Sequence, residues 1–207
     1  MRTKDLSMPN AIPQFFLQSS AVHPFKLHPI DGPADCVVNQ ALNVMVRVDG
    51  QGAEPTFERW AVLEYKEIRL GAALNQDIAW EDVLDGYSDE LMALRQALYV
   101  DMVSLSGGLD YRADVEALMP VSNIACDLLY IESENLADTD IGLAALEVLI
   151  QHSTCGMAIV PLSAAACDEE TTIRRVSQLA RLGFAKLPGQ PFLVLDLGIR
   201  RPSVLNG

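Results

Sequence analysis

Cysteine and histidine side chains can bind zinc, and cysteines can also undergo redox chemistry, so their spacing in this 207-residue chain is informative. The four cysteines are Cys36, Cys126, Cys155 and Cys167, and none of them belongs to a Cys-x-x-Cys pair. The three histidines do not stand at the spacing from these cysteines that zinc sites use. We therefore expect reduced, mostly buried thiols in a cytoplasmic protein, and no metal site.

Short motifs for other kinds of chemistry are absent from the sequence. The sequence Ser106-Gly107-Gly108 predicts a loop, but the Gly-Lys-Ser/Thr that completes a phosphate-binding loop does not follow it. Neither G-x-S-x-G nor H-E-x-x-H occurs. Nothing therefore supports a metal enzyme, a nucleotide-dependent dehydrogenase or a Ser-His-Asp hydrolase.

Composition and charge exclude some partners. Hydrophobic residues make up 50% of the chain, enough for a sizeable core, and the formal net charge is −13. Binding to nucleic acid draws on Lys and Arg contacts with phosphate, so neither a nucleic acid nor an anionic membrane is an expected partner. No apolar run approaches the ~20 residues that span a bilayer, and no signal peptide is recognisable at the start.

The periodicity of the sequence predicts the elements that must position any site. Residues 1–34 carry five prolines and predict an irregular N-terminal arm, followed by a single α/β domain over residues 35–207. The patterns predict strands over 36–48, 59–70, 123–133, 156–162 and 192–197, and helices over 78–99, 140–152 and 168–182. Strands and helices alternate in the second half, which implies crossover connections and some parallel pairing.

The helix expected over 78–99 has two distinct faces. One face is an apolar stripe at steps of three and four residues, made of Trp80, Leu84, Tyr87, Leu91, Leu94 and Leu98. Acidic residues lie mainly off this stripe and near the N-terminal half, where the helix dipole favours them. We interpret the stripe as core packing and the acidic face as solvated surface.

Two segments resemble the GNAT family of N-acetyltransferases. Residues 128–150 read LLYIESENLADTDIGLAALEVLI, like the family's strand, pyrophosphate loop and helix, and residues 179–184 read LARLGF, like the end of its next helix. The likeness covers about residues 120–200. It implies a mixed central sheet flanked by helices and a site for acetyl-CoA or another acyl-CoA.

The resemblance also implies a set of cofactor contacts. In this family, a helix N-terminus presents unpaired amides to the pyrophosphate, and glycines allow close approach. The pattern Arg/Gln-x-x-Gly-x-Gly/Ala matches Thr139 to Ala144, with Thr139 replacing Arg or Gln. The implied contacts are Ile131, Ser133, Thr139, Ile141, Gly142, Leu143 and Ala144. Asp138 and Asp140 lie where the pyrophosphate is expected, and they would either cap the helix or repel the anion.

Catalytic roles are implied in the same way. Family members often use a carboxylate on the central strand as general base, and Glu132 is the first candidate here, with Glu134 second. The tyrosine that serves as general acid in the family is replaced by Leu179. Ser177 lies nearby and is the remaining candidate, and water can also protonate a thiolate leaving group.

Three hypotheses on function follow. The first is an N-acyltransferase that moves an acetyl or similar group from a CoA thioester to an amine-bearing small molecule or protein. The second is a non-catalytic GNAT-like domain that binds a metabolite or a protein. The third is an acidic interaction protein that mimics nucleic acid. The sequence leaves the acyl acceptor, the acyl chain length and the choice between monomer and homodimer open.

Overall fold

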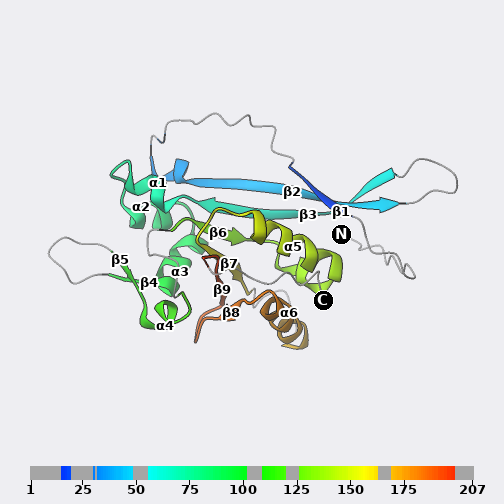
Figure 1. Ribbon diagram of the computed structural model, residues 1–207. Coiled ribbons are helices and arrows are strands. Elements are labelled where there is room, and N and C mark those ends of the chain that lie inside the picture. The colour runs from blue at the N-terminus through cyan, green and yellow to red at the C-terminus, as the bar shows by residue number, and fades with distance from the viewer. Residues whose placement is uncertain are drawn as a thin grey trace.

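A mixed seven-stranded sheet forms the centre of the protein, with helices on both of its faces (Figure 1). The computed structural model describes residues 15–19, 30, 32–48, 56–101, 109–119, 126–162 and 169–198. The order of the strands in this sheet is β1-β2-β3-β6-β7-β9-β8, and β4 and β5 form a separate two-stranded sheet. All pairs are antiparallel except β6 with β7, which is the parallel pair that the crossover pattern predicted.

The elements have these bounds. The strands are β1 (Phe15–Ser19), β2 (Val37–Val48), β3 (Thr56–Ile68), β4 (Tyr99–Asp101), β5 (Leu109–Tyr111), β6 (Leu128–Ile131), β7 (Met157–Pro161), β8 (Ala185–Lys186) and β9 (Phe192–Asp196). The α-helices are α1 (Leu70–Leu74), α2 (Trp80–Asp85), α3 (Asp89–Leu98), α4 (Ala113–Glu116), α5 (Asp140–His152) and α6 (Glu169–Arg181). Two short 3₁₀ helices are η1 (Pro33–Cys36) and η2 (Glu134–Asp138).

The two faces of the sheet carry separate hydrophobic cores. Side chains alternate between the faces along a strand, and β6 illustrates the division. Leu128 and Tyr130 belong to the core that α1–α4 cover, whereas Leu129 and Ile131 belong to the core that α5 and α6 cover. All four are buried, so β6 is a fully covered central strand. Its C-terminal end is where the candidate site residues emerge.

Several expected elements are confirmed. The strand over 36–48 is β2, the helix over 140–152 is α5, and the helix over 168–182 is α6. Gly183 follows α6 with φ of 90°, the left-handed conformation that ends a helix. The strand expected over 59–70 is β3, but it starts earlier and stops at Ile68, because α1 begins at Leu70.

The prediction of a single helix over residues 78–99 is wrong. The chain forms α2 and α3 instead, because Gly86 ends the first and the Ser88 hydroxyl caps the second by accepting from the Leu91 amide. The apolar stripe still packs inward across this break, with Leu84 and Leu91 fully buried. Most of the expected acidic face is exposed.

The N-terminal arm also differs from expectation at one place. Phe15–Ser19 forms β1, which pairs antiparallel with β2 at the edge of the sheet, rather than an irregular segment. Most of the remaining residues expected to form the arm lie outside the described ranges. The patterns also missed the short elements α1, α4, β4, β5 and β8. None of the helices in the described ranges combines the length and hydropathy needed to cross a bilayer.

Candidate functional site

The first candidate base, Glu132, directly follows β6 and is partly exposed. Its Oε1 accepts a hydrogen bond from the Lys66 ammonium of β3. Lys66 is the cross-strand neighbour of Tyr130 in the β3–β6 pair, which places its side chain on the face covered by α1–α4. The carboxylate and the ammonium therefore meet at the C-terminal end of the central strand.

Lys66 is buried although it is charged. Its side chain is 9% exposed, and its Nζ lies 3.7 Å from Glu90 Oε2 of α3 and 5.4 Å from the centroid of the Tyr130 ring. A buried ammonium needs such compensation, because it has lost most of its hydration. Two carboxylates and one aromatic face supply it here.

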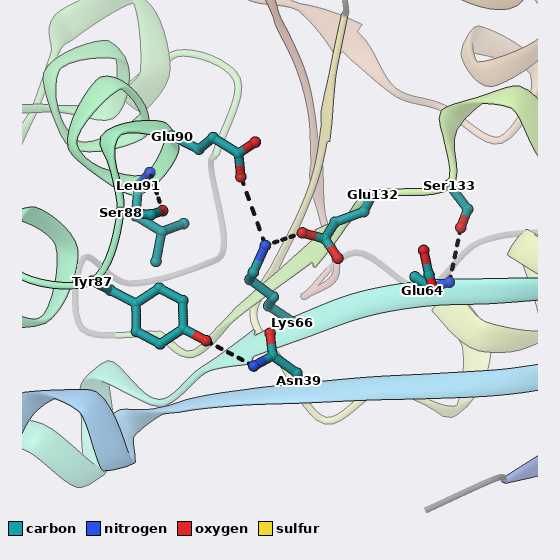
Figure 2. A network of polar contacts seen from close by, with 9 residues as sticks. All are labelled: Asn39, Glu64, Lys66, Tyr87, Ser88, Glu90, Leu91, Glu132 and Ser133. Carbon is teal, nitrogen blue, oxygen red and sulfur yellow. Dashed lines mark hydrogen bonds and ion pairs between the residues drawn. The ribbon is translucent and has the colours of Figure 1, made fainter.

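Further polar contacts hold the strands and α3 around this ammonium (Figure 2). The Asn39 side-chain amide of β2 donates to the Tyr87 hydroxyl, at 2.7 Å, just before α3. On the other side of Glu132, the Glu64 amide of β3 donates to the Ser133 hydroxyl at 2.8 Å. Ser133 is buried, so this hydroxyl fixes the turn of the chain out of β6 rather than facing solvent.

The strands β6 and β7 separate at this same end. Their last pair in register is Tyr130 with Ile159. Beyond that pair β7 continues along β9, as far as Pro161 opposite Phe192. The chain that leaves β6 continues instead along β3, so a gap in main-chain pairing begins between the two parallel strands.

A proline explains where the parallel ladder stops. The Glu132 amide donates to the Glu64 carbonyl at 2.9 Å, so Glu132 directs its main chain toward β3. Main-chain groups alternate in direction along a strand, so the Ile131 carbonyl points toward β7. The next donor in that ladder would be residue 161, and Pro161 has no N–H. No amide at that position of β7 can therefore pair with the Ile131 carbonyl.

The start of α5 is capped from within the chain. The Gly142 amide donates to the Thr139 hydroxyl at 3.1 Å, and the Leu143 amide donates to the Thr139 carbonyl at 2.9 Å. The Ala144 amide lies far enough into α5 to bond within the helix. Only the first residues of a helix lack an intrahelical acceptor, which here leaves the amides of Asp140 and Ile141 for an anion.

The absence of a side chain at Gly142 allows the main chain of Leu136, rather than a ligand, to lie close to α5. A Cβ at this position would overlap the Leu136 carbonyl oxygen and would lie 2.7 Å from the carbonyl carbon and 2.9 Å from the Cα of the same residue. The 3₁₀ helix η2 therefore packs directly on the first turn of α5. The resemblance assigned this glycine to the phosphates, but this contact gives it a different role.

The expectation that Asp138 caps the helix is wrong, because Thr139 is the cap and Asp138 is paired elsewhere. Arg175 of α6 donates from Nε and Nη2 to the two Asp138 oxygens at 2.9 and 2.8 Å. Arg175 is buried, whereas Arg174 keeps 57% of its side chain exposed and lies 3.8 Å from Asp138. The pair fixes η2 to α6 and offsets the carboxylate that was expected to repel an anion.

The other candidates are scattered. The Glu134 side chain lies outside the described residues, and Ser177 is exposed on α6. Leu179, at the position of the family's tyrosine, is fully buried in the core beneath α5 and α6. Leu179 therefore cannot take over the role of the tyrosine as general acid, because its side chain has no hydroxyl and packs into the core.

Sequence reasoning missed Lys66, Arg174 and Arg175. Lys66 stands inside a strand pattern where a charged residue normally faces solvent, so nothing indicated that it is buried. The basic character of residues 174 and 175 was visible, but their proximity to η2 depends on how α6 packs.

Among the described residues, no group of three or more His, Cys, Asp or Glu side chains could hold a metal ion. Comparison with protein-family models, with curated proteins and with solved structures found no match to this chain.

Proposed function

We propose that this protein is an acyl-CoA-dependent N-acyltransferase that transfers an acetyl or similar acyl group to an amine. The order strand, loop, helix, parallel strand, helix and antiparallel strand over β6 to β9 supports this proposal. So does the GNAT-like sequence of β6, η2 and α5, which occupies the corresponding place in that order.

The contact between Glu132 and Lys66 carries the proposal. A general base must reach the proton that it removes, within hydrogen-bond distance of the amine. Glu132 already accepts a hydrogen bond from a primary ammonium, so the carboxylate has the geometry that an acceptor amine would need. It also lies one residue from Ile131, whose carbonyl has no partner at Pro161 and could bind the amide of a pantetheine arm.

The reaction follows from these groups. Glu132 removes a proton from the acceptor amine, the amine nitrogen attacks the thioester carbonyl carbon, and the bond from carbon to sulfur breaks. Leu179 has no proton to give, so water protonates the thiolate that leaves. The exposed acidic side chains of α3, among them Glu90, favour a cationic acceptor.

The phosphates of the cofactor would bind beside η2. The amides of Asp140 and Ile141 have no acceptor within α5, and the exposed Arg174 guanidinium, 3.8 Å from Asp138, supplies a positive charge from α6. This arrangement replaces the Arg or Gln that the family pattern places at Thr139. The carboxylate of Asp140 opposes the anion, so we expect modest affinity.

Titration of the protein with acetyl-CoA to millimolar concentration tests the proposal. Binding should raise the melting temperature by mass action, and Arg174→Ala should reduce the shift. Added primary amines should then release CoA thiol, and Glu132→Gln should slow that release by about 10²–10⁴-fold without weakening binding. The proposal would be refuted if millimolar acetyl-CoA produced no melting shift and no heat of binding.

A second candidate is a GNAT-like domain that binds a ligand without catalysis. The internal cap at Thr139 and the buried Leu179 favour it, because both replace groups that an enzyme of this kind would use. A melting shift with acetyl-CoA but no thiol release with any amine would support this candidate. The third hypothesis, an acidic interaction protein that mimics nucleic acid, requires residues 78–99 to present regularly spaced carboxylates outward, and the acidic residues of this segment are divided between α2 and α3.

A further inference from the structure

Lys66 presents a primary amine at the position where the proposed acceptor would bind. Its Nζ is hydrogen-bonded to Glu132 Oε1, the oxygen that would remove a proton from an acceptor. Glu90 Oε2, at 3.7 Å, lies on the other side of the same ammonium (Figure 2). An acceptor amine from solution would have to compete with Lys66 for the Glu132 carboxylate.

We propose that Lys66 is an internal acyl acceptor, so that the protein acylates itself on this residue when a CoA thioester binds at the end of β6. This inference rests on the proposed function, because it uses the same base and the same cofactor. It goes further by naming one amine of the chain as a substrate. The alternative role for Lys66 is that of a permanent ion-pair partner.

Acyl transfer to Lys66 needs no co-reactant other than the CoA thioester. Glu132 takes one proton from the Lys66 ammonium and later releases it to solvent. The neutral nitrogen attacks the thioester carbonyl carbon, the new bond from nitrogen to carbon forms, and the bond from carbon to sulfur breaks. The second proton on the nitrogen passes to the thiolate through water, which gives an amide on Lys66 and free CoA thiol.

Acylation would change the site, because it removes the positive charge that lies between Glu132 and Glu90. Both carboxylates would lose their ion-pair partner, and Glu132 would be available to the next amine. The contact from β3 to the first turn of α3 through Glu90 would weaken as well. The first acyl group would therefore convert the site from a closed ion pair to a form that accepts an external amine.

The different exposure of two lysines distinguishes acylation within the site from non-enzymatic chemical acylation. Non-enzymatic acylation by a thioester favours accessible amines, and Lys186 of β8 is exposed whereas Lys66 is buried. Burial and an ion pair both slow the chemical reaction at Lys66. Preferential modification of Lys66 therefore requires a bound thioester and a base beside the amine.

The experiment incubates the full chain with acetyl-CoA and follows acetylation of each lysine by peptide mass spectrometry, with the melting shift measured in the same samples. We expect one acetyl group per chain, on Lys66 ahead of Lys186. Glu132→Gln should slow modification of Lys66 by about 10²-fold or more while leaving Lys186 unchanged. Lys66→Arg should abolish the modification while keeping the charge.

The outcomes separate the two proposals. A melting shift with acetyl-CoA but no acetylation of Lys66 would overturn this inference and leave the proposed function standing. Equal acetylation of Lys66 and Lys186, or the same rate in Glu132→Gln, would also overturn it, because chemical acylation would then suffice. Absence of both the shift and the modification would overturn the proposed function and this inference together.

Discussion

Replacing Gly142 with alanine sets two physical effects against each other. Helix propensity alone predicts that the substitution stabilises α5 by about 1 kcal/mol. The added Cβ would, however, overlap the Leu136 carbonyl and lie 2.7 Å from its carbon, and these are main-chain atoms that no rotamer change can move. Overpacking of this kind costs about 1–3 kcal/mol.

The upper part of that range applies here, because η2 cannot easily move away from α5. Leu136 and Ala137 are buried, and Asp138 is bound by Arg175 at both of its oxygens. A cost of about 3 kcal/mol, less the gain of about 1 kcal/mol in propensity, leaves a net loss of about 2 kcal/mol in the free energy of unfolding. For a chain of this length the melting temperature should fall by about 4–8 °C.

Urea denaturation followed by circular dichroism, together with a thermal melt, measures this loss. Gly32→Ala is the matched control, because a Cβ there meets nothing within 4 Å and the backbone is extended, with φ of −173°. The control should be neutral or slightly stabilising. A Gly142→Ala protein as stable as this control would refute the reasoning, since η2 would then yield to the methyl group at no cost.

The remaining predictions concern an ion pair and the response to alkali. Asp138→Asn should lower the free energy of unfolding by about 2–3 kcal/mol, because it leaves the buried Arg175 guanidinium without this carboxylate. The loss should not be larger, because the Asp138 side chain is partly exposed. The exposed Asp140→Asn is the control in the same urea assay and should cost less than about 1 kcal/mol; equal losses would contradict this explanation. Burial raises the pKa of the Cys155 thiol from 9.0 to about 11 and that of the Tyr65 hydroxyl from 10.0 to about 12. The unfolded chain releases these protons at lower pH than the folded chain, so stability should fall progressively from about pH 9 to 12, and Tyr65→Phe should reduce the slope above about pH 10. An unfolding free energy that stays constant from about pH 8 to 11 would disprove this linkage.

Local patterns predicted the elements of the second half well, and the reason is that each of them is strongly periodic. Helix α5 is apolar on most of its sides, and Gly183 stops α6 by its left-handed conformation. Strand β6 is a short apolar run whose residues are buried on both faces. These signals lie within a few residues of one another, so the sequence contains them completely.

Periodicity also misled the prediction at one point. The apolar stripe from Trp80 to Leu98 continues at helical spacing across Gly86 and Ser88, although the helix does not. Both α2 and α3 pack on the same core, so one stripe serves two helices. Serine is a common N-cap residue, so Ser88 could have indicated the start of a second helix, but the continuous apolar stripe favoured a single helix.

The sequence by itself determined the strands β2, β6, β7 and β9 and the helices α5 and α6, and its resemblance to a known family pointed to Glu132 and the first turn of α5 as candidates. Only the tertiary structure decided what those candidates contact. The pairing of β3 with β6 brings Lys66 to Glu132 across 66 positions of sequence, and the packing of α6 on η2 brings Arg175 to Asp138 across 37. Local patterns cannot encode such contacts, because each depends on which strands pair and which helices pack, and a shift of one residue in register would turn Lys66 to the opposite face of the sheet.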